Sequence, residues 1–184
     1  PNLKLISQFG KYPHIDIAAC SDHGVLVCSG KRSLAPTHAA AEHSWALIMS
    51  AMKNIPGQMQ NLRNGKWQQG VGKGLFGRRL GLYGYGRIAK RVAEYAEAFG
   101  MQVEWWGSAD GRARAQADGR SIANDRADFF AKNDIVSVHV RLTPETSGII
   151  TASDLAKMKQ DALLVNTSRS ALLGPNVLLQ ALEA

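Results

Sequence analysis

Cysteine is scarce in this sequence of 184 residues, which contains only Cys20 and Cys28. Two cysteines are too few for a disulfide framework, and neither has further metal-binding side chains at a useful spacing. We therefore expect no metal site, and a reducing, cytoplasmic setting for the protein.

Long apolar runs are absent as well. No stretch of about 18 consecutive apolar residues occurs, so we expect no membrane-spanning segment. The first residues do not combine a basic region, an apolar run and a small-residue cleavage site, so we expect no secretory signal. Because 45% of the residues are hydrophobic and 20% are charged, the chain can bury a sizeable core, which excludes a wholly disordered protein.

Acidic residues are missing from one stretch, residues 61–93, which carries eight of the 22 Lys and Arg residues. The other 14 basic residues stand against 15 Asp and Glu, so this stretch accounts for the entire net charge of +7. On charge alone three explanations remain open: a nucleic acid, a phosphorylated small molecule, or a solvated basic surface.

Short apolar runs alternate with segments of helical periodicity along the chain. We expect strands at 3–7, 25–28, 79–83, 102–106, 134–140 and 162–167, and helices at 15–20, 37–55, 87–99, 124–132, 153–159 and 175–184. Residues 57–77 contain six glycines and no sustained periodicity, and we interpret them as a loop. The alternation predicts an α/β fold of the Rossmann type, with a doubly wound, mostly parallel sheet covered by helices on both faces.

The most specific pattern is the glycine-rich turn Gly84-Tyr-Gly86-Arg-Ile-Ala89, which lies between an expected strand and an expected helix. In this context Gly-x-Gly-x-x-Gly/Ala is typical of dinucleotide binding. Gly84 allows the tight turn, and Gly86 lets the backbone approach a pyrophosphate. The N–H groups of Arg87 and Ile88 then face the phosphates at the positive end of the helix.

The same pattern predicts an acidic residue about 20 positions further on, which would bind the ribose hydroxyls. Glu104 is near that distance, but it lies inside the expected strand and points to the opposite face, so we assign it a structural or solvent-facing role. Gly107 and Ser108 occupy the strand end instead. Because Arg112 and Arg114 follow, a 2′-phosphate can be accommodated, and we favour NADP slightly over NAD. In the alternative, Ser108 and backbone groups serve NAD.

Polar residues also stand at the carboxyl ends of two other expected strands, where ligands of open parallel sheets collect. Arg169 follows a buried strand directly, and its planar guanidinium suits a carboxylate. His139 as a hydrogen-bonded core residue and Arg141 as a solvated charge remain alternatives to ligand contact. The candidates at the two ends are His139, Val140 and Arg141, and Thr167, Ser168 and Arg169.

Three motifs in this order resemble the D-isomer-specific 2-hydroxyacid dehydrogenases. They are Gly84-Tyr-Gly86-Arg-Ile-Ala89, Ser137-Val-His139-Val-Arg-Leu-Thr-Pro-Glu-Thr146 and Leu164-Val-Asn-Thr-Ser-Arg169. The resemblance runs over almost the whole chain. It implies that residues 1–36 are the end of a flavodoxin-like substrate domain, 37–56 an interdomain helix, 57–74 a linker and 75–184 a truncated dinucleotide-binding domain. Parts of the family's pattern are missing at both ends, so we expect a fragment of a longer protein.

The resemblance also implies roles for individual cofactor-binding residues. The N–H groups of Arg87 and Ile88 would contact the pyrophosphate. Gly107 occupies the position where the family usually has Asp, which argues against a strict NAD preference. The remaining contacts would come from Val140, Arg141 and Thr146 on the adenine and nicotinamide-ribose side, where the family commonly has Pro at position 141, and from Thr167 and Ser168 beside the nicotinamide.

Arg169 matches the family's catalytic arginine, which binds the substrate carboxylate and polarises the 2-oxo group, although Ser170 stands where the family has Gly. The implied reaction passes a hydride between NAD(P)H and a small 2-oxo acid or D-2-hydroxy acid. The developing alkoxide needs a proton, but none of the five histidines matches the family's catalytic His, and its Glu partner is missing too. We therefore expect the 184-residue chain alone to be inactive.

Two other functions compete with this enzyme. A non-catalytic, dinucleotide-sensing relative would keep the same fold, and only further sequence distinguishes it. A nucleic-acid binder is least favoured, because aromatic residues are not interleaved with the basic ones. The family is usually dimeric through the region of residues 37–55. We therefore expect a homodimer that acts on a small 2-oxo or 2-hydroxy acid, without nucleic-acid or membrane partners.

Overall fold

The computed structural model describes residues 2–8, 14–30 and 35–183, and the chain divides into two compact units, Pro1–Pro36 and Thr37–Ala184. The first unit contains β1 (Leu5–Gln8), α1 (Ile17–Asp22) and β2 (Leu26–Ser29). Its two strands are parallel and paired in register from Leu5 opposite Leu26 onward. The Asp16 carboxylate starts α1 by accepting a hydrogen bond from the Ala19 N–H at 2.9 Å. This unit is therefore a single strand–helix–strand repeat.

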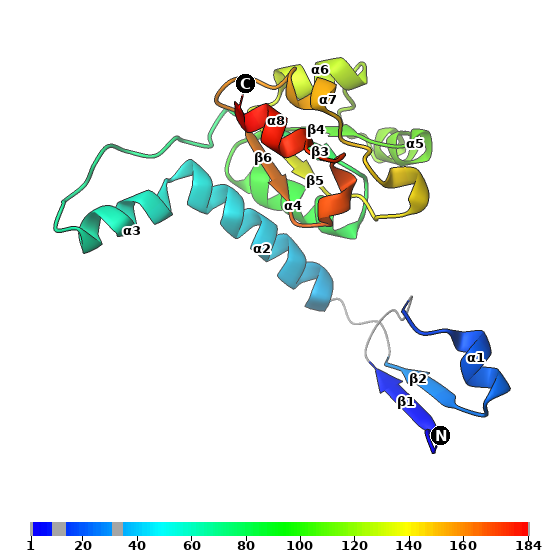
Figure 1. Cartoon of the computed structure of the whole chain (residues 1–184). Coiled ribbons are helices and arrows are strands. Elements are labelled where there is room, and N and C mark those ends of the chain that lie inside the picture. The colour runs from blue at the N-terminus through cyan, green and yellow to red at the C-terminus, as the bar shows by residue number, and fades with distance from the viewer. Residues whose placement is uncertain (1, 9–13, 31–34, 184) are drawn as a thin grey trace. The chain divides into compact units, whose positions relative to one another are not determined.

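The second unit is built on a four-stranded parallel sheet of β3 (Arg79–Tyr83), β4 (Gln102–Trp106), β5 (Ile135–Val138) and β6 (Leu163–Asn166). The strand order is β4-β3-β5-β6 (Figure 1), so the chain reverses direction across the sheet at β3. Every neighbouring pair is parallel. The predicted α/β fold with a parallel sheet is confirmed.

Helices cover both faces of this sheet (Figure 1). Leu80 and Leu82 of β3 pack in one core cluster with α2 and α4, whereas Tyr83 packs in the other with Phe129 and Phe130 of α6. This split follows from the alternation of side chains along a strand. The helices are α2 (Ala35–Met52), α3 (Ile55–Arg63), α4 (Arg87–Ala98), α5 (Ala109–Ala117), α6 (Arg126–Lys132), α7 (Ala152–Leu155) and α8 (Val177–Glu183), with single 3-10 turns η1 (Pro144–Thr146) and η2 (Ser170–Leu172).

Two helices were not expected from the sequence. Residues 57–77 are not all loop, because α3 extends through residue 63. Pro56 lies in the first turn of this new helix, a position that proline favours. Asn54, at φ 50°, separates the two helices. The polar segment after β4 forms α5, which buries only Gly111 and Ala115. α5 has no continuous apolar face, and the apolar residues of α3, at positions 55, 59 and 62, stand beside Pro56 and Gly57, which favour a turn.

Other boundaries shift by a few residues. The helix expected at 37–55 begins at Ala35 and ends at Met52, and the one expected from residue 175 begins at Val177. The Asp125 carboxylate caps the N-terminus of α6, and the Thr151 hydroxyl caps the N-terminus of α7. Among the residues that the structure describes, no helix is long and apolar enough to cross a membrane. Nor do three or more His, Cys, Asp or Glu side chains of that part of the chain gather where they could hold a metal ion.

Candidate functional site

A cavity of about 610 Å³ opens at the carboxyl end of the sheet, which we name the Gly84 cavity. It is bounded by the ends of β3, β4 and β5 and by residues of α5, α6 and η1. Of the residues expected to bind a cofactor, those that line it are Gly84, Gly86, Gly107, Ser108, His139, Val140, Arg141 and Thr146. Arg87 and Ile88 lie next to it, in the first turn of α4.

The glycine turn forms one wall of this cavity and shows why glycine is needed there. Gly84 has a φ of +111°, and a Cβ at this position would lie 2.7 Å from the carbonyl oxygen of His139. A Cβ on Gly86 would meet nothing within 4 Å, so the backbone there borders open space. Gly86 also forms the N-cap of α4, a helix of 12 residues. A bare backbone beside open space at a helix N-terminus fits a pyrophosphate.

The β4 end of the cavity carries an arginine, whereas the glycine pattern predicts a carboxylate there for the ribose hydroxyls. The Arg112 Nη1 donates a hydrogen bond to the Gly107 carbonyl at 2.5 Å, and its guanidinium lies 4.3 Å from the centre of the Trp106 ring. Ser108 caps α5 by accepting from the Gly111 N–H at 3.1 Å. Arg112 forms no ion pair with any residue that the structure describes, whereas Arg114 is paired with Asp110 at 3.1 Å.

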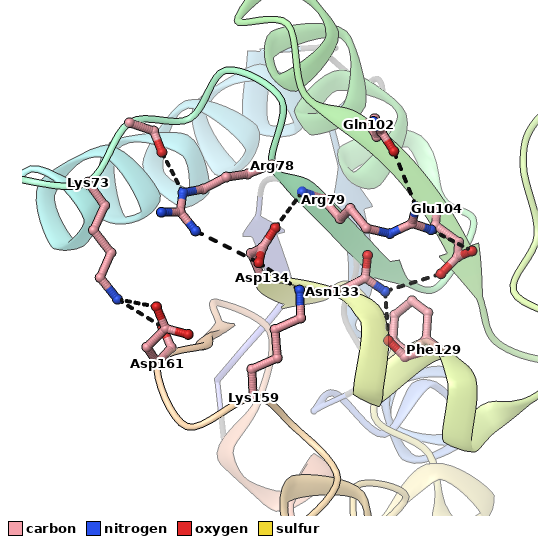
Figure 2. Close-up of polar contacts among 11 residues, drawn as sticks. Lys73, Arg78, Arg79, Gln102, Glu104, Phe129, Asn133, Asp134, Lys159 and Asp161 are labelled. Atoms are coloured by element: carbon pink, nitrogen blue, oxygen red, sulfur yellow. Dashed lines mark hydrogen bonds and ion pairs between the residues drawn. The ribbon is translucent and has the colours of Figure 1, made fainter.

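Glu104 takes no part in this cavity. Its side chain is buried and forms an ion pair with Arg79 at 3.1 Å, and it accepts a hydrogen bond from the Asn133 amide at 3.3 Å (Figure 2). The structural role expected for this residue is confirmed.

His139 is largely buried at the end of β5. Its Nε2 lies 2.9 Å from the Ser137 hydroxyl, and burial lowers the pKa of the imidazole to about 4. The ring therefore stays neutral at physiological pH. The hydrogen bond to Ser137 meets the alternative of a hydrogen-bonded histidine, whereas contact between His139 and a ligand stays a prediction, supported by its place in the cavity lining.

Arg126, which no local sequence pattern singles out, also lines the Gly84 cavity. Its Nε and Nη2 each lie 2.7 Å from a carboxylate oxygen of Asp154, and its Nη1 donates to the Tyr83 hydroxyl at 3.0 Å. Burial alone would raise the pKa of Asp154, but the hydrogen bonds from Arg126 and Thr151 outweigh it and lower the pKa. This pair ties α6 to α7 below the cavity; no local pattern could reveal partners so far apart in sequence.

A second hollow of about 590 Å³, which we name the Arg169 cavity, lies at the end of β6 and contains Thr167, Ser168 and Arg169. Asn166 holds this turn: its Oδ1 accepts from the Ser168 N–H at 3.0 Å and its Nδ2 donates to the Arg169 carbonyl at 2.9 Å. The Arg169 side chain is exposed and donates only to the Ser168 carbonyl, at 2.7 Å, among the described residues. Asn166 was not singled out in the sequence, although Asn before small polar residues is a known turn signal.

The basic stretch 61–93 is largely neutralised by the fold. Five of its eight cations form ion pairs with carboxylates: Lys73, Arg78, Arg79, Lys90 and Arg91. Arg87 stands at the glycine turn without an ion pair in the described part of the chain. Most of this charge is therefore structural, and only the part of the stretch at residues 83–88 borders the Gly84 cavity.

The model of one protein family, "D-isomer specific 2-hydroxyacid dehydrogenase, NAD binding domain", matches residues 45–184. The chain belongs to this family. Its likeness to curated members extends over its whole length: it is 33% identical to the glyoxylate reductase of Thermococcus litoralis, over 100% of this chain and 57% of that protein. It is 35% identical to the D-3-phosphoglycerate dehydrogenase of Mycobacterium tuberculosis, over 99% of this chain and 34% of that protein.

Two solved structures have the same fold as this chain. A phosphoglycerate oxidoreductase from Vibrio cholerae O395 superposes with a TM-score of 0.89 at 43% identity, covering 99% of this chain and 58% of that one. D-lactate dehydrogenase from Salmonella gives a TM-score of 0.82 at 25% identity, covering 98% and 54%. The chain thus spans between a third and about three fifths of the relatives named here.

Proposed function

We propose that the protein to which this chain belongs is an NAD(P)-dependent oxidoreductase that interconverts a small 2-oxo acid and its D-2-hydroxy acid. The Gly84 cavity carries the proposal, because it combines a glycine that tolerates no Cβ, open space at Gly86 and the N-terminus of α4. The family membership of residues 45–184 supports the same conclusion.

The cofactor-binding residues divide along the strand ends. Gly84, Gly86 and the N–H groups of Arg87 and Ile88 would hold the pyrophosphate. Beyond β3 on one side, the β4 end with Gly107 and Ser108 would hold the adenosine ribose, and on the other side the β5 and β6 ends would hold the nicotinamide half. The bound nicotinamide supplies or accepts the hydride. His139, Val140, Arg141 and Thr146 would line the path between these halves.

Arg169 is the proposed substrate-binding residue. Its guanidinium is exposed in the Arg169 cavity and forms no ion pair with the described residues, so it is available to bind a carboxylate through two parallel hydrogen bonds. A donor-only side chain beside a 2-oxo group also stabilises negative charge as it develops on that oxygen. The Asn166 bridge would hold the backbone of Arg169 at the end of β6.

We further propose that the protein prefers NADP over NAD. Four arginines line the Gly84 cavity, namely Arg112, Arg114, Arg126 and Arg141, while no Asp or Glu does. Arg112 lies at the β4 end, beside the carbonyl of Gly107. A carboxylate there would repel a 2′-phosphate, whereas an unpaired guanidinium attracts it.

The test is a comparison of NADPH and NADH on the full-length protein, by dissociation constant and by kcat/KM with glyoxylate, hydroxypyruvate, pyruvate and 3-phosphohydroxypyruvate. We expect Arg112→Ala to weaken NADPH binding about ten-fold and to change NADH binding little, because a charge-assisted contact to phosphate is removed. Arg120→Ala is the matched control, since Arg120 is paired with Glu97 and does not line the cavity. A clear preference for NADH contradicts the NADP proposal alone, and no turnover with any of the substrates contradicts the enzyme.

We also propose a homodimer in the reducing cytoplasm. Large apolar side chains are exposed on α3 and the segment after it, and a second copy would cover them: Ile55, Met59, Leu62, Trp67 and Val71. Sedimentation of the protein tests the dimer. Both cysteines are free thiols, which supports a reducing compartment.

A further inference from the structure

A chain of hydroxyl groups links α2 to the end of β6. Ser44 of α2 is fully buried, and its hydroxyl donates a hydrogen bond to the Ala40 carbonyl at 2.8 Å. The same oxygen lies 2.7 Å from the hydroxyl oxygen of Thr167. A serine hydroxyl has one proton to donate, and Ser44 uses it on Ala40. The geometry allows either hydroxyl to donate across the contact between Ser44 and Thr167, and we assign the donor role to Thr167 because the Ala40 carbonyl can only accept.

The direction of this hydrogen bond determines whether the Thr167 hydroxyl donates to a ligand or accepts from it. With its proton turned toward Ser44, the Thr167 oxygen presents only lone pairs to the Arg169 cavity, which it lines. Ser168 likewise donates its hydroxyl proton inward, to the Val138 carbonyl at 2.9 Å. The cavity thus has hydrogen-bond acceptors beside the donor-only guanidinium of Arg169, and its complementary ligand carries both an N–H or O–H donor and an anion.

We propose that Ser44 is a positioning residue that fixes Thr167 as the acceptor for the amide N–H of the nicotinamide. The proposal rests on the proposed function, in which the nicotinamide half lies over the ends of β5 and β6. A carboxamide supplies the N–H donor, and the substrate carboxylate supplies the anion for Arg169. Fixing the hydroxyl also orients the carboxamide, and with it the plane of the ring to which it is attached.

The test compares three ligands that differ only at the nicotinamide. They are NADPH, its reduced 3-acetylpyridine analogue, in which a methyl ketone replaces the amide and removes the N–H donors, and 2′-phospho-ADP-ribose, which lacks the ring. Dissociation constants are measured on the full-length protein by quenching of tryptophan fluorescence. The corresponding NAD ligands are measured in parallel, so that a preference for NAD does not affect the outcome.

Thr167→Val keeps the shape of the side chain and removes the acceptor. We expect it to weaken NADPH binding about five-fold, as one neutral hydrogen bond of about 1 kcal/mol requires. Binding of the acetylpyridine analogue and of 2′-phospho-ADP-ribose stays unchanged, and Thr167→Ser restores NADPH binding. An equal loss for all three ligands, or no loss for any, overturns the proposal. So does an amide-specific loss in Ser168→Ala instead.

Ser44 is tested by a double-mutant cycle. Ser44→Ala frees the Thr167 proton, so we expect a weaker amide-specific loss of about two-fold, and no further loss when Ser44→Ala is added to Thr167→Val. Additive losses would mean that Ser44 acts only on packing, and would overturn its role. Ser50→Ala, on the same helix but outside the cavity lining, is the matched control. If the wild-type protein binds no dinucleotide at all, the proposed function fails as well, which the other outcomes do not imply.

Discussion

The two ends of one parallel sheet carry arginines in opposite circumstances. At the amino end, Arg78 and Arg79 face carboxylates, Asp134 at 3.8 Å and Glu104 at 3.1 Å (Figure 2). At the carboxyl end, Arg114 and Arg126 are paired with Asp110 and Asp154, but Arg112, Arg141 and Arg169 form no ion pair within the described residues. All of these are equally basic in the sequence, so the difference lies in what the fold places opposite each one. Paired cations hold the sheet together, and unpaired ones are available to a ligand.

Asp134 is the centre of the amino end. It accepts from the Arg79 N–H at 2.8 Å and is paired with Lys159 at 2.8 Å (Figure 2). Burial would raise its pKa, but the hydrogen bonds and cations outweigh burial and lower it. Nearby, the Arg79 Nε and Asn133 Oδ1 atoms are buried without a hydrogen-bond partner in the described part of the chain. Such atoms cost stability, so this end depends on the pairs that remain.

The largest effect is expected at the carboxyl end, from Arg169→Leu. Removing the guanidinium should lower kcat/KM about 100- to 1000-fold, because a donor to the developing charge on the substrate is lost. The dissociation constant of NADPH and the stability should stay the same, since Arg169 forms no ion pair to break. Steady-state kinetics measures kcat/KM, quenching of tryptophan fluorescence measures the dissociation constant, and chemical denaturation measures the free energy of unfolding, with Arg169→Lys as the conservative variant. If the free energy of unfolding fell together with kcat/KM, the contrast between the two ends would disappear.

At the amino end we expect the reverse, from Glu104→Ala. This change leaves the half-buried Arg79 without its carboxylate and should lower the free energy of unfolding by about 2 kcal/mol. This figure is smaller than the cost of breaking a fully buried ion pair, because Arg79 is partly exposed. Chemical denaturation measures it. The dissociation constant of the cofactor should not change, because Glu104 does not line the Gly84 cavity. If the variant had normal stability but bound the cofactor more weakly, Glu104 would have to be a ribose ligand, and its structural role would be contradicted.

The smallest effect is expected from Lys159→Met. Lys159 is 39% exposed and Asp134 keeps its other partners, so the loss should be about 0.5 kcal/mol and should vanish at high salt. Denaturation at two salt concentrations checks this. A salt-independent loss as large as that of Glu104→Ala would show that the amino end acts as one cooperative network.

Local patterns were sufficient for much of the fold and part of the site. The strands flanking the glycine turn and α4 were expected almost at their observed bounds, because apolar runs and glycines signal them directly. The helices α3 and α5 were missed because they are short and bury almost nothing: α3 has no buried residue, and α5 buries only Gly111 and Ala115. Arg126 and Ser44 were missed for another reason: their partners, Asp154 and Thr167, lie far away in the sequence.

What the sequence determined by itself was the glycine turn, the alternation of strand and helix, and the residues that follow each strand. These are local properties, set by backbone sterics and by the pattern of apolar residues. Only the tertiary structure decided which cations are neutralised, which hydroxyl protons are committed, and which strand ends share a cavity. Those properties depend on distances between residues that are remote in sequence, and Coulomb and hydrogen-bond energies are functions of such distances.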